Sequence, residues 1–138
     1  MTVTKITPWN FGNDDKGNCS PDGFHRLFFY NLNEVAMGAP LRGECYLECK
    51  DNVKIKIHDS CGGPPVWETT GRLVAIPIWM TQMDQRVGVV DVIKKELTIF
   101  QKSFSVLQLR SFHNGVIYAD LPATFDTRKE KIDDVIKM

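Results

Sequence analysis

The chain has no excess of either charge, because its 17 Lys and Arg residues balance its 17 Asp and Glu residues. A dedicated nucleic-acid-binding domain usually carries a basic excess, so the zero formal net charge argues against one. The sequence has no apolar run of membrane-spanning length. Its N-terminal stretch lacks the apolar segment of a secretory signal. We therefore expect a cytoplasmic protein that binds neither a membrane nor nucleic acid directly.

Cysteine is scarce, with four residues in 138: Cys19, Cys45, Cys49 and Cys61. An even number would suggest disulfides in a small secreted chain, but nothing here indicates secretion, so we expect reduced thiols, most of them buried. Cys45 and Cys49, with His58 and Cys61 nearby, are the residue types that bind zinc. On an extended strand, however, positions four apart are roughly 13 Å apart. We therefore expect no metal and no cofactor.

The common catalytic signatures are also missing. The chain has no Gly-x-Ser-x-Gly nucleophile motif. The stretch CGGPPVW (61–67) is rich in Gly and Pro but leads into a strand and lacks a Lys-Ser/Thr pair, so it does not predict a phosphate loop. His25, His58 and His113 lie at turns or on a predicted solvent face. A small hydrolase or nuclease using histidine acid–base chemistry, for example with His25, Lys54 and His113, is the alternative function from a different class.

What the sequence does have is apolar residues at a period of two, which predicts strands. The strands are expected at 26–32, 43–50, 52–59, 71–80, 85–93, 95–101, 103–112 and 115–121. Asp51-Asn52, Lys94 and His113-Asn114-Gly115 would be the hairpin turns. The run 71–80 is apolar on both faces and predicts a central strand. Its Pro77 has no N–H for a ladder, which predicts a bulge or a local edge there.

Two segments repeat a pattern typical of a β-propeller blade. SPDGFHRLFFY (20–30) and WETTGRLVAIPIW (67–79) each pass from a polar turn ending in Gly into an apolar strand. About three such units fit the chain, whereas a closed ring needs about four or more. We therefore predict a mainly β fold that is one antiparallel domain over residues 1–138, a twisted sheet or sandwich of blade-like hairpins. An oligomeric, ligand-binding β module is the alternative.

The C-terminal tail changes character. Ile132, Val135 and Ile136 follow helical spacing, which predicts a short C-terminal helix. An extended final strand is the alternative.

Two segments are candidates for a contact surface, EVAMGAP (34–40) and IWMTQMDQR (78–86). Methionine gives an adaptable apolar contact, and tryptophan is a large anchor at interfaces. Acidic neighbours would favour a basic partner. The candidate contact residues are Glu34, Met37, Trp79, Met80 and Asp84. The alternative is that Met37, Trp79 and Met80 are core residues.

The sequence from about residue 20 to 122 resembles small bacterial immunity proteins of polymorphic toxin systems, of the contact-dependent inhibition or Rhs type. The resemblance rests on Met-Gly-Ala-Pro (37–40), Pro-Val-Trp (65–67) and Ala-Ile-Pro-Ile-Trp (75–79). It implies an antitoxin, not an enzyme, that binds the cognate toxin C-terminal domain, often a nuclease, and blocks its active site. Many nuclease inhibitors are strongly acidic. This chain is neutral, so a local acidic surface would have to do the steering.

Overall fold

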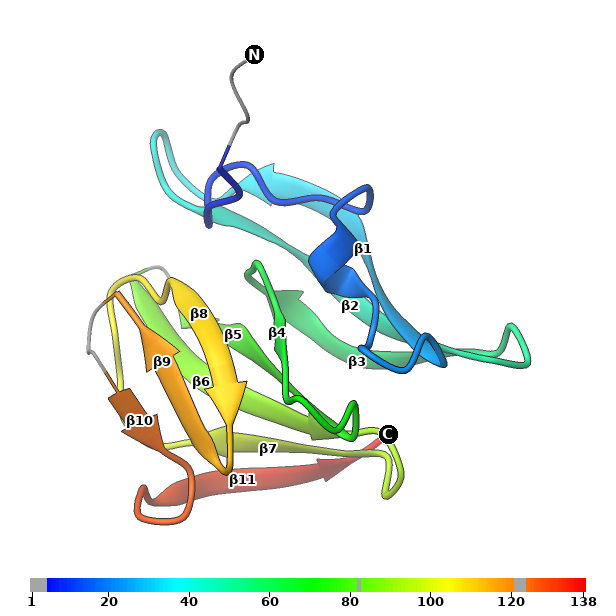
Figure 1. The fold of residues 1–138 in the computed structure, drawn as a ribbon. Helices are drawn as coiled ribbons and strands as arrows, with labels where there is room; N and C mark the ends of the chain where they lie inside the picture. The colour runs from blue at the N-terminus through cyan, green and yellow to red at the C-terminus, as the bar shows by residue number, and fades with distance from the viewer. Residues whose placement is uncertain (1–4, 82, 121–123) are drawn as a thin grey trace.

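A computed structural model describes residues 5–81, 83–120 and 124–138. The elements are the 3₁₀ helix η1 (Lys16–Asn18) and the strands β1 (His25–Glu34), β2 (Leu41–Cys49), β3 (Lys54–Cys61), β4 (Val66–Trp67), β5 (Leu73–Thr81), β6 (Asp84–Asp91), β7 (Glu96–Phe100), β8 (Leu109–His113), β9 (Val116–Ala119), β10 (Thr124–Asp126) and β11 (Ile132–Lys137) (Figure 1). The predicted fold class is confirmed: the protein is mainly β and its named strands pair antiparallel.

Some of the sequence predictions fall on residues outside the described ranges. These are residues 1–4 of the N-terminal stretch, Gln82 within the contact segment 78–86, and Leu121 at the end of the predicted strand 115–121. No helix in the described part of the chain is long and apolar enough to cross a membrane.

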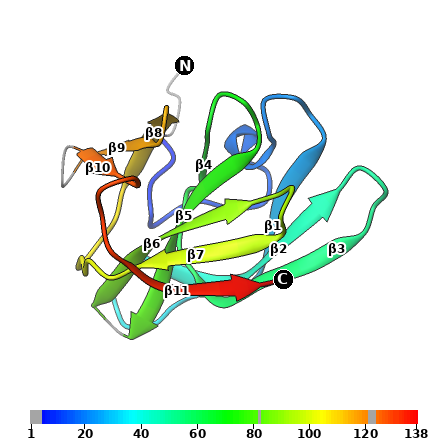
Figure 2. The same cartoon turned by 90° about the horizontal axis from the view of Figure 1, so that it is seen from below.

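Within the described ranges, the strands form two sheets. The larger has the order β1-β2-β3-β5-β6-β7-β11, with β4 also pairing with β5, and the smaller has the order β10-β9-β8. The larger sheet curves strongly, and the smaller sheet lies beside its β5–β7 part (Figures 1 and 2). The three blade-like units therefore do not form a ring, because β3 pairs with β5 and β11 pairs with β7.

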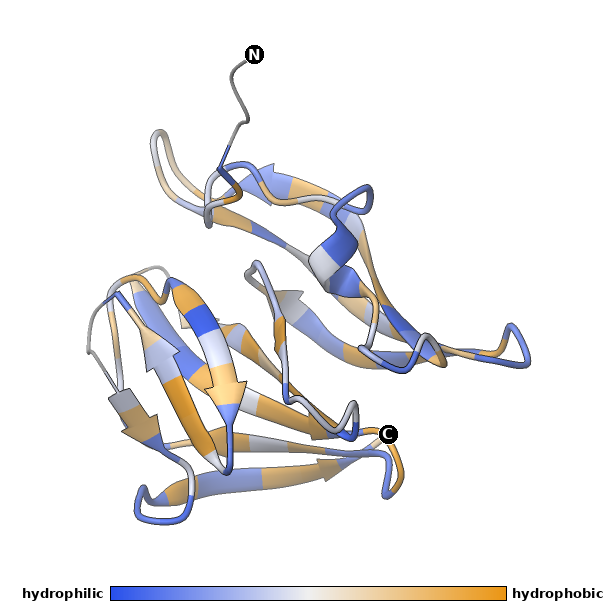
Figure 3. Cartoon of the chain, in the orientation of Figure 1, coloured by the Kyte–Doolittle hydropathy of each residue, from blue (hydrophilic) through white to orange (hydrophobic). Residues whose placement is uncertain are grey.

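Strand β5 is buried on both faces, as its sequence predicts. Val74, Ile76 and Ile78 belong to a core that the curved sheet encloses, together with residues of β1, β2, β3, β6 and β7. Ala75 belongs to a second core between the larger sheet and β8–β10, which includes Phe112. Strands β1 and β2 instead alternate hydrophobic and hydrophilic residues, because only one of their faces meets a core (Figure 3).

Pro77 lies at a local edge, one of the two predicted solutions. The register between β5 and β6 is continuous through the pair Pro77–Val87, so no bulge interrupts it there. On the other side of β5, strand β3 pairs only at Ile78, and β4 begins its pairing at Ala75. The chain between β3 and β4 passes Pro77, whose carbonyl oxygen accepts from the Gly62 N–H at 2.8 Å. The missing proline N–H therefore removes no ladder bond.

The predicted C-terminal helix is wrong, and the alternative of a final strand is correct. Residues 132–137 form β11, which pairs antiparallel with β7, for example at Val135–Thr98 and Ile136–Leu97. The physical reason is that β7 would otherwise be an open sheet edge, and pairing satisfies its backbone groups. A short helix has marginal stability of its own, so tertiary pairing overrides the helical spacing.

The absence of a side chain at Gly88 in β6 is a packing requirement of the first core. A Cβ added there would lie 2.6 Å from Ile78 Cγ1 and 3.1 Å from Leu97 Cδ1. We expect Gly88→Ala to lower the free energy of unfolding by about 1–3 kcal/mol, the usual cost of overpacking. Urea denaturation would measure it. Gly12→Ala is the matched control, because a Cβ there would meet no described atom within 4 Å. Equal stability of the two variants would contradict this account of the core.

Candidate functional site

Four large apolar side chains are exposed at one end of the molecule. Trp9 is 47% exposed, Met37 99%, Met80 41% and Met83 66%. Met37 lies in the loop between β1 and β2, Met80 lies near the end of β5, and Met83 lies in the turn between β5 and β6. Figures 1 and 2 both place this loop and this turn on the same side of the molecule. We call the surface formed by these four residues and Glu34 the contact end.

Hydrogen bonds hold the N-terminal segment against the β1–β2 loop. The Trp9 indole N–H donates to the Gly38 carbonyl at 2.9 Å, and the Leu41 N–H donates to the Pro8 carbonyl at 3.0 Å. The Glu34 carboxylate accepts from the Gly38 N–H at 3.3 Å across the same loop. The exposed side chains of Trp9 and Met37 are therefore carried on backbone that is fixed at several points.

Met83 occupies a backbone conformation that its side chain does not favour. Its φ is +66°, in the left-handed region. It lies in the tight turn closed by the pair Thr81–Asp84, where Gly or Asn is the usual residue. For other residues, the left-handed conformation costs about 1–2 kcal/mol. Folding therefore gives no reason for methionine at this position, whereas a role for the exposed side chain does.

Three of the five predicted contact residues, Glu34, Met37 and Met80, are exposed. Trp79 is only 2% exposed, so the alternative that it is a core residue is correct, and it is not available to touch a partner. Its indole N–H donates to the Leu41 carbonyl at 3.2 Å, which joins β5 to the base of the β1–β2 loop. Trp79 therefore supports the contact end from beneath.

Asp84 is half-buried and already paired. Its carboxylate accepts from Arg86 Nε at 3.1 Å and Nη2 at 3.3 Å, and from the Ser103 hydroxyl. The Arg86 hydrogen bond, followed by that of Ser103, lowers the pKa of Asp84 below its ordinary value. Its charge is compensated within the protein, so Asp84 is not free to attract a basic partner.

Sequence reasoning missed Trp9, and it placed Met83 within the candidate segment 78–86 without naming it as a contact residue. Trp9 lies outside every predicted strand, and nothing in the local pattern indicates where the N-terminal segment packs. Met83 did carry a signal, since it stands beside Asp84 in a turn where Gly or Asn is expected.

The proposed set of His25, Lys54 and His113 comes from three different strands, β1, β3 and β8. His25 begins β1, with its ring 6.5 Å from that of Trp67, and His113 ends β8. The Lys54 ammonium donates to the Tyr30 hydroxyl at 2.8 Å. No hydrogen bond between described residues joins His25, Lys54 and His113 to one another. The alternative of a histidine hydrolase or nuclease stays a prediction.

The cysteines are free thiols in different surroundings. Cys45 and Cys61 are fully buried, Cys49 is half-buried and Cys19 is exposed. Burial raises the pKa of the Cys61 thiol well above its ordinary value, so this thiol stays protonated. Among the described residues, no group of three or more His, Cys, Asp or Glu side chains is placed to hold a metal ion.

Comparison with known proteins assigns no family. The chain matches no family model, no curated protein and no solved structure. The resemblance to immunity proteins therefore stays a prediction, and the geometry of the molecule is the remaining guide to its function. That geometry is a β-sheet body with an exposed tryptophan and three exposed methionines at one end.

His58 makes the stability of the fold depend on pH. Burial lowers its pKa below the ordinary 6.5, and its Nδ1 accepts from the Ser60 N–H at 3.0 Å. The unfolded chain binds this proton more readily, so the neutral histidine contributes stability above pH 6.5 that is lost as the pH falls below it. His25 is shifted in the same direction, chiefly by burial, and adds to the effect.

We expect urea denaturation to show lower stability at about pH 5.5 than at about pH 7.5, above the range where carboxylates titrate. His58→Gln removes one titrating group and should reduce this loss. A variant that loses as much stability as the wild-type protein would show that His58 does not contribute.

Proposed function

We propose that the protein is an immunity protein, which binds a cognate bacterial toxin C-terminal domain through the contact end and blocks its active site. The observation that carries the proposal is the exposure of Trp9, Met37, Met80 and Met83 at one end of the molecule. In this proposal the protein acts in the cytoplasm and has no catalysis of its own. The sequence resemblance supports a toxin domain as the partner, and the exposed apolar side chains support the contact end as the binding surface.

The composition of the contact end suits protein recognition. Tryptophan is enriched among the residues that contribute most to binding energy, and methionine adapts its shape to a partner. Large apolar side chains exposed on the same side of a molecule are candidates for an interaction site. The loop and turn that carry them are joined to a rigid sheet, the usual arrangement of binding loops on a scaffold.

The charges at the contact end provide little electrostatic steering of a partner. Glu34 is exposed, but Asp84 is compensated by Arg86. The contact end therefore presents little of the acidic field that speeds association with a basic nuclease. We expect association near the unsteered rate of about 10⁵–10⁶ M⁻¹s⁻¹, with a weak dependence on salt. Apolar contact would then supply most of the affinity.

The first test is co-expression with the toxin C-terminal domain encoded immediately upstream. We expect a stoichiometric complex and rescue of growth. Met37→Glu should weaken the complex at least about ten-fold without changing stability, because the side chain is 99% exposed and a buried carboxylate at an interface is costly. Val53→Glu is the matched control, because Val53 is 50% exposed at the far end of β2, in the β2–β3 turn. Absence of a complex, or equal affinity of the Met37 and Val53 variants, would refute the proposal.

Met83→Asn separates binding from folding. Asparagine tolerates the left-handed conformation better than methionine, so we expect the free energy of unfolding to stay equal or rise by up to about 1 kcal/mol. The loss of the apolar side chain should weaken the complex several-fold. Urea denaturation and titration calorimetry would measure the two effects. Undiminished toxin binding would remove Met83 from the interface.

A further inference from the structure

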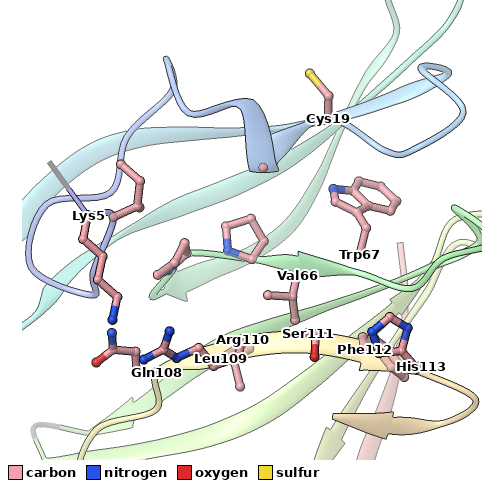
Figure 4. Close-up of a pocket in the computed structure, with 14 residues that line it drawn as sticks. Lys5, Cys19, Val66, Trp67, Gln108, Leu109, Arg110, Ser111, Phe112 and His113 are labelled. Carbon is pink, nitrogen blue, oxygen red and sulfur yellow. The ribbon is translucent and has the colours of Figure 1, made fainter. Parts of the chain in front are cut away.

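A pocket of about 440 Å³ lies between the N-terminal segment, β4 and β8 (Figure 4). None of the residues that define the contact end lines it. Its lining residues include the polar and aromatic side chains of Lys5, Trp67, Gln108, Arg110 and His113. Its volume is within the usual range of small-molecule sites.

One end of this pocket is cationic. Figure 4 shows the Lys5 side chain pointing toward Gln108 and Arg110, across the space between the N-terminal segment and β8. No carboxylate is among the lining residues. The Arg110 guanidinium is paired through Nε with Asp120, which does not line the pocket, so its other N–H groups and the Lys5 ammonium are the donors that face a bound anion. The Gln108 amide adds a neutral donor to the ammonium and guanidinium groups.

The remainder of the pocket is lined mainly by apolar residues and rings, with Ser111 and His113 among them. Pro64 and Pro65 also line the pocket, and Figure 4 shows Val66 between the cationic end and Trp67 and His113 at the other. The Trp67 indole N–H donates to the Asn18 carbonyl at 3.2 Å, so the ring is held in place. Flat apolar walls of this kind favour a ring that stacks, whereas a bare inorganic ion would leave them unused.

The groups at the cationic end are positioned by contacts outside the pocket. The Asn10 side chain donates to the Lys5 carbonyl at 2.9 Å and accepts from the Thr7 N–H at 2.6 Å, which anchors the segment that carries Lys5. The Arg110 Nε donates to Asp120 at 2.6 Å. Asp120 orients the guanidinium and also competes with any ligand for its charge.

We propose that this pocket binds a small organic anion, in which a phosphate or carboxylate group contacts Lys5, Gln108 and Arg110 and an attached flat ring packs against Pro65 and Trp67. This ligand is separate from the toxin domain, and the site does not depend on the proposed immunity function. The shared chemistry is an anionic group joined to a ring, and the experiment distinguishes phosphate from carboxylate.

Titration calorimetry of the full chain would use adenosine 5′-monophosphate, indole-3-acetate, adenosine and inorganic phosphate as probes. We expect at least one of the first two to bind with a Kd below about 1 mM. Adenosine lacks the anion and inorganic phosphate lacks the ring, so each should bind at least about ten-fold more weakly. Preference for the nucleotide would identify a phosphate site, and preference for the indole acid a carboxylate site.

Variants of the charged residues test whether the cationic end of the pocket binds the anion. Lys5→Gln and Arg110→Gln should each weaken binding roughly ten-fold, the loss of a charge-assisted hydrogen bond. Asp120→Asn should strengthen binding, because it removes the competing carboxylate. Lys102→Gln is the control, since this cation lies elsewhere, in an ion pair with Glu130. No saturable binding of either anion up to about 5 mM, or equal affinity in the Lys5, Arg110 and Lys102 variants, would overturn the proposal.

Discussion

The burial of β5 and β6 on both faces is the constraint on which the remaining structure depends. The even-numbered residues of β5, Val74 to Ile78, face the core enclosed by the curved sheet, and Ala75 faces the second core. A hairpin with two apolar faces needs a cover on each side to be stable in water. Strands β1–β3 cover one face of this hairpin because the larger sheet curves. Strands β8–β10 cover the other face when the chain returns. The positions of the β1–β2 loop and of the pocket beside β8 follow from how these two groups of strands pack.

Gln85 of β6 fixes the segment of chain that leads from the larger sheet to the smaller sheet. Its backbone N–H and carbonyl both pair with Phe104, at 2.7 and 2.9 Å, and its side-chain oxygen accepts from the Leu107 N–H. The residue is fully buried, which is unusual for glutamine. A buried polar group is costly unless it is paired: the Gln85 side-chain oxygen is paired, whereas its amide nitrogen has no hydrogen-bond partner among the described residues. The three bonds that are made fix the path of residues 104–107 as the chain crosses to the small sheet. The position of β8, and hence one wall of the pocket, follows from that path.

The sequence was sufficient for features that depend on local pattern and insufficient for those that depend on distant partners. Period-two alternation and turn residues predicted the hairpins around 51–52, 94 and 113–115 because a turn and its strands are neighbours in the chain. The strand expected from 103 begins only at Leu109, since Phe104 pairs with Gln85 of β6 and not with β9. Strand β11 depends on the free edge of β7, which no local pattern reveals. Trp79 and Met80 are adjacent in sequence, but their side chains point to opposite faces of the sheet. Trp79 is therefore buried, whereas Met80 is exposed at the contact end.

The N-terminal segment connects the two proposed sites, although it contributes no strand. It supplies Trp9 to the contact end and Lys5 to the pocket, and Phe11 fixes it to the core with a ring 5.0 Å from that of Phe29. Phe11 can approach so closely only because Gly63 has no side chain: a Cβ there would lie 2.7 Å from the phenyl ring. The Gly-Pro-rich stretch after β3 therefore has a positive role in packing. It leaves the space that lets an irregular segment lie against the sheet and present different side chains on either side.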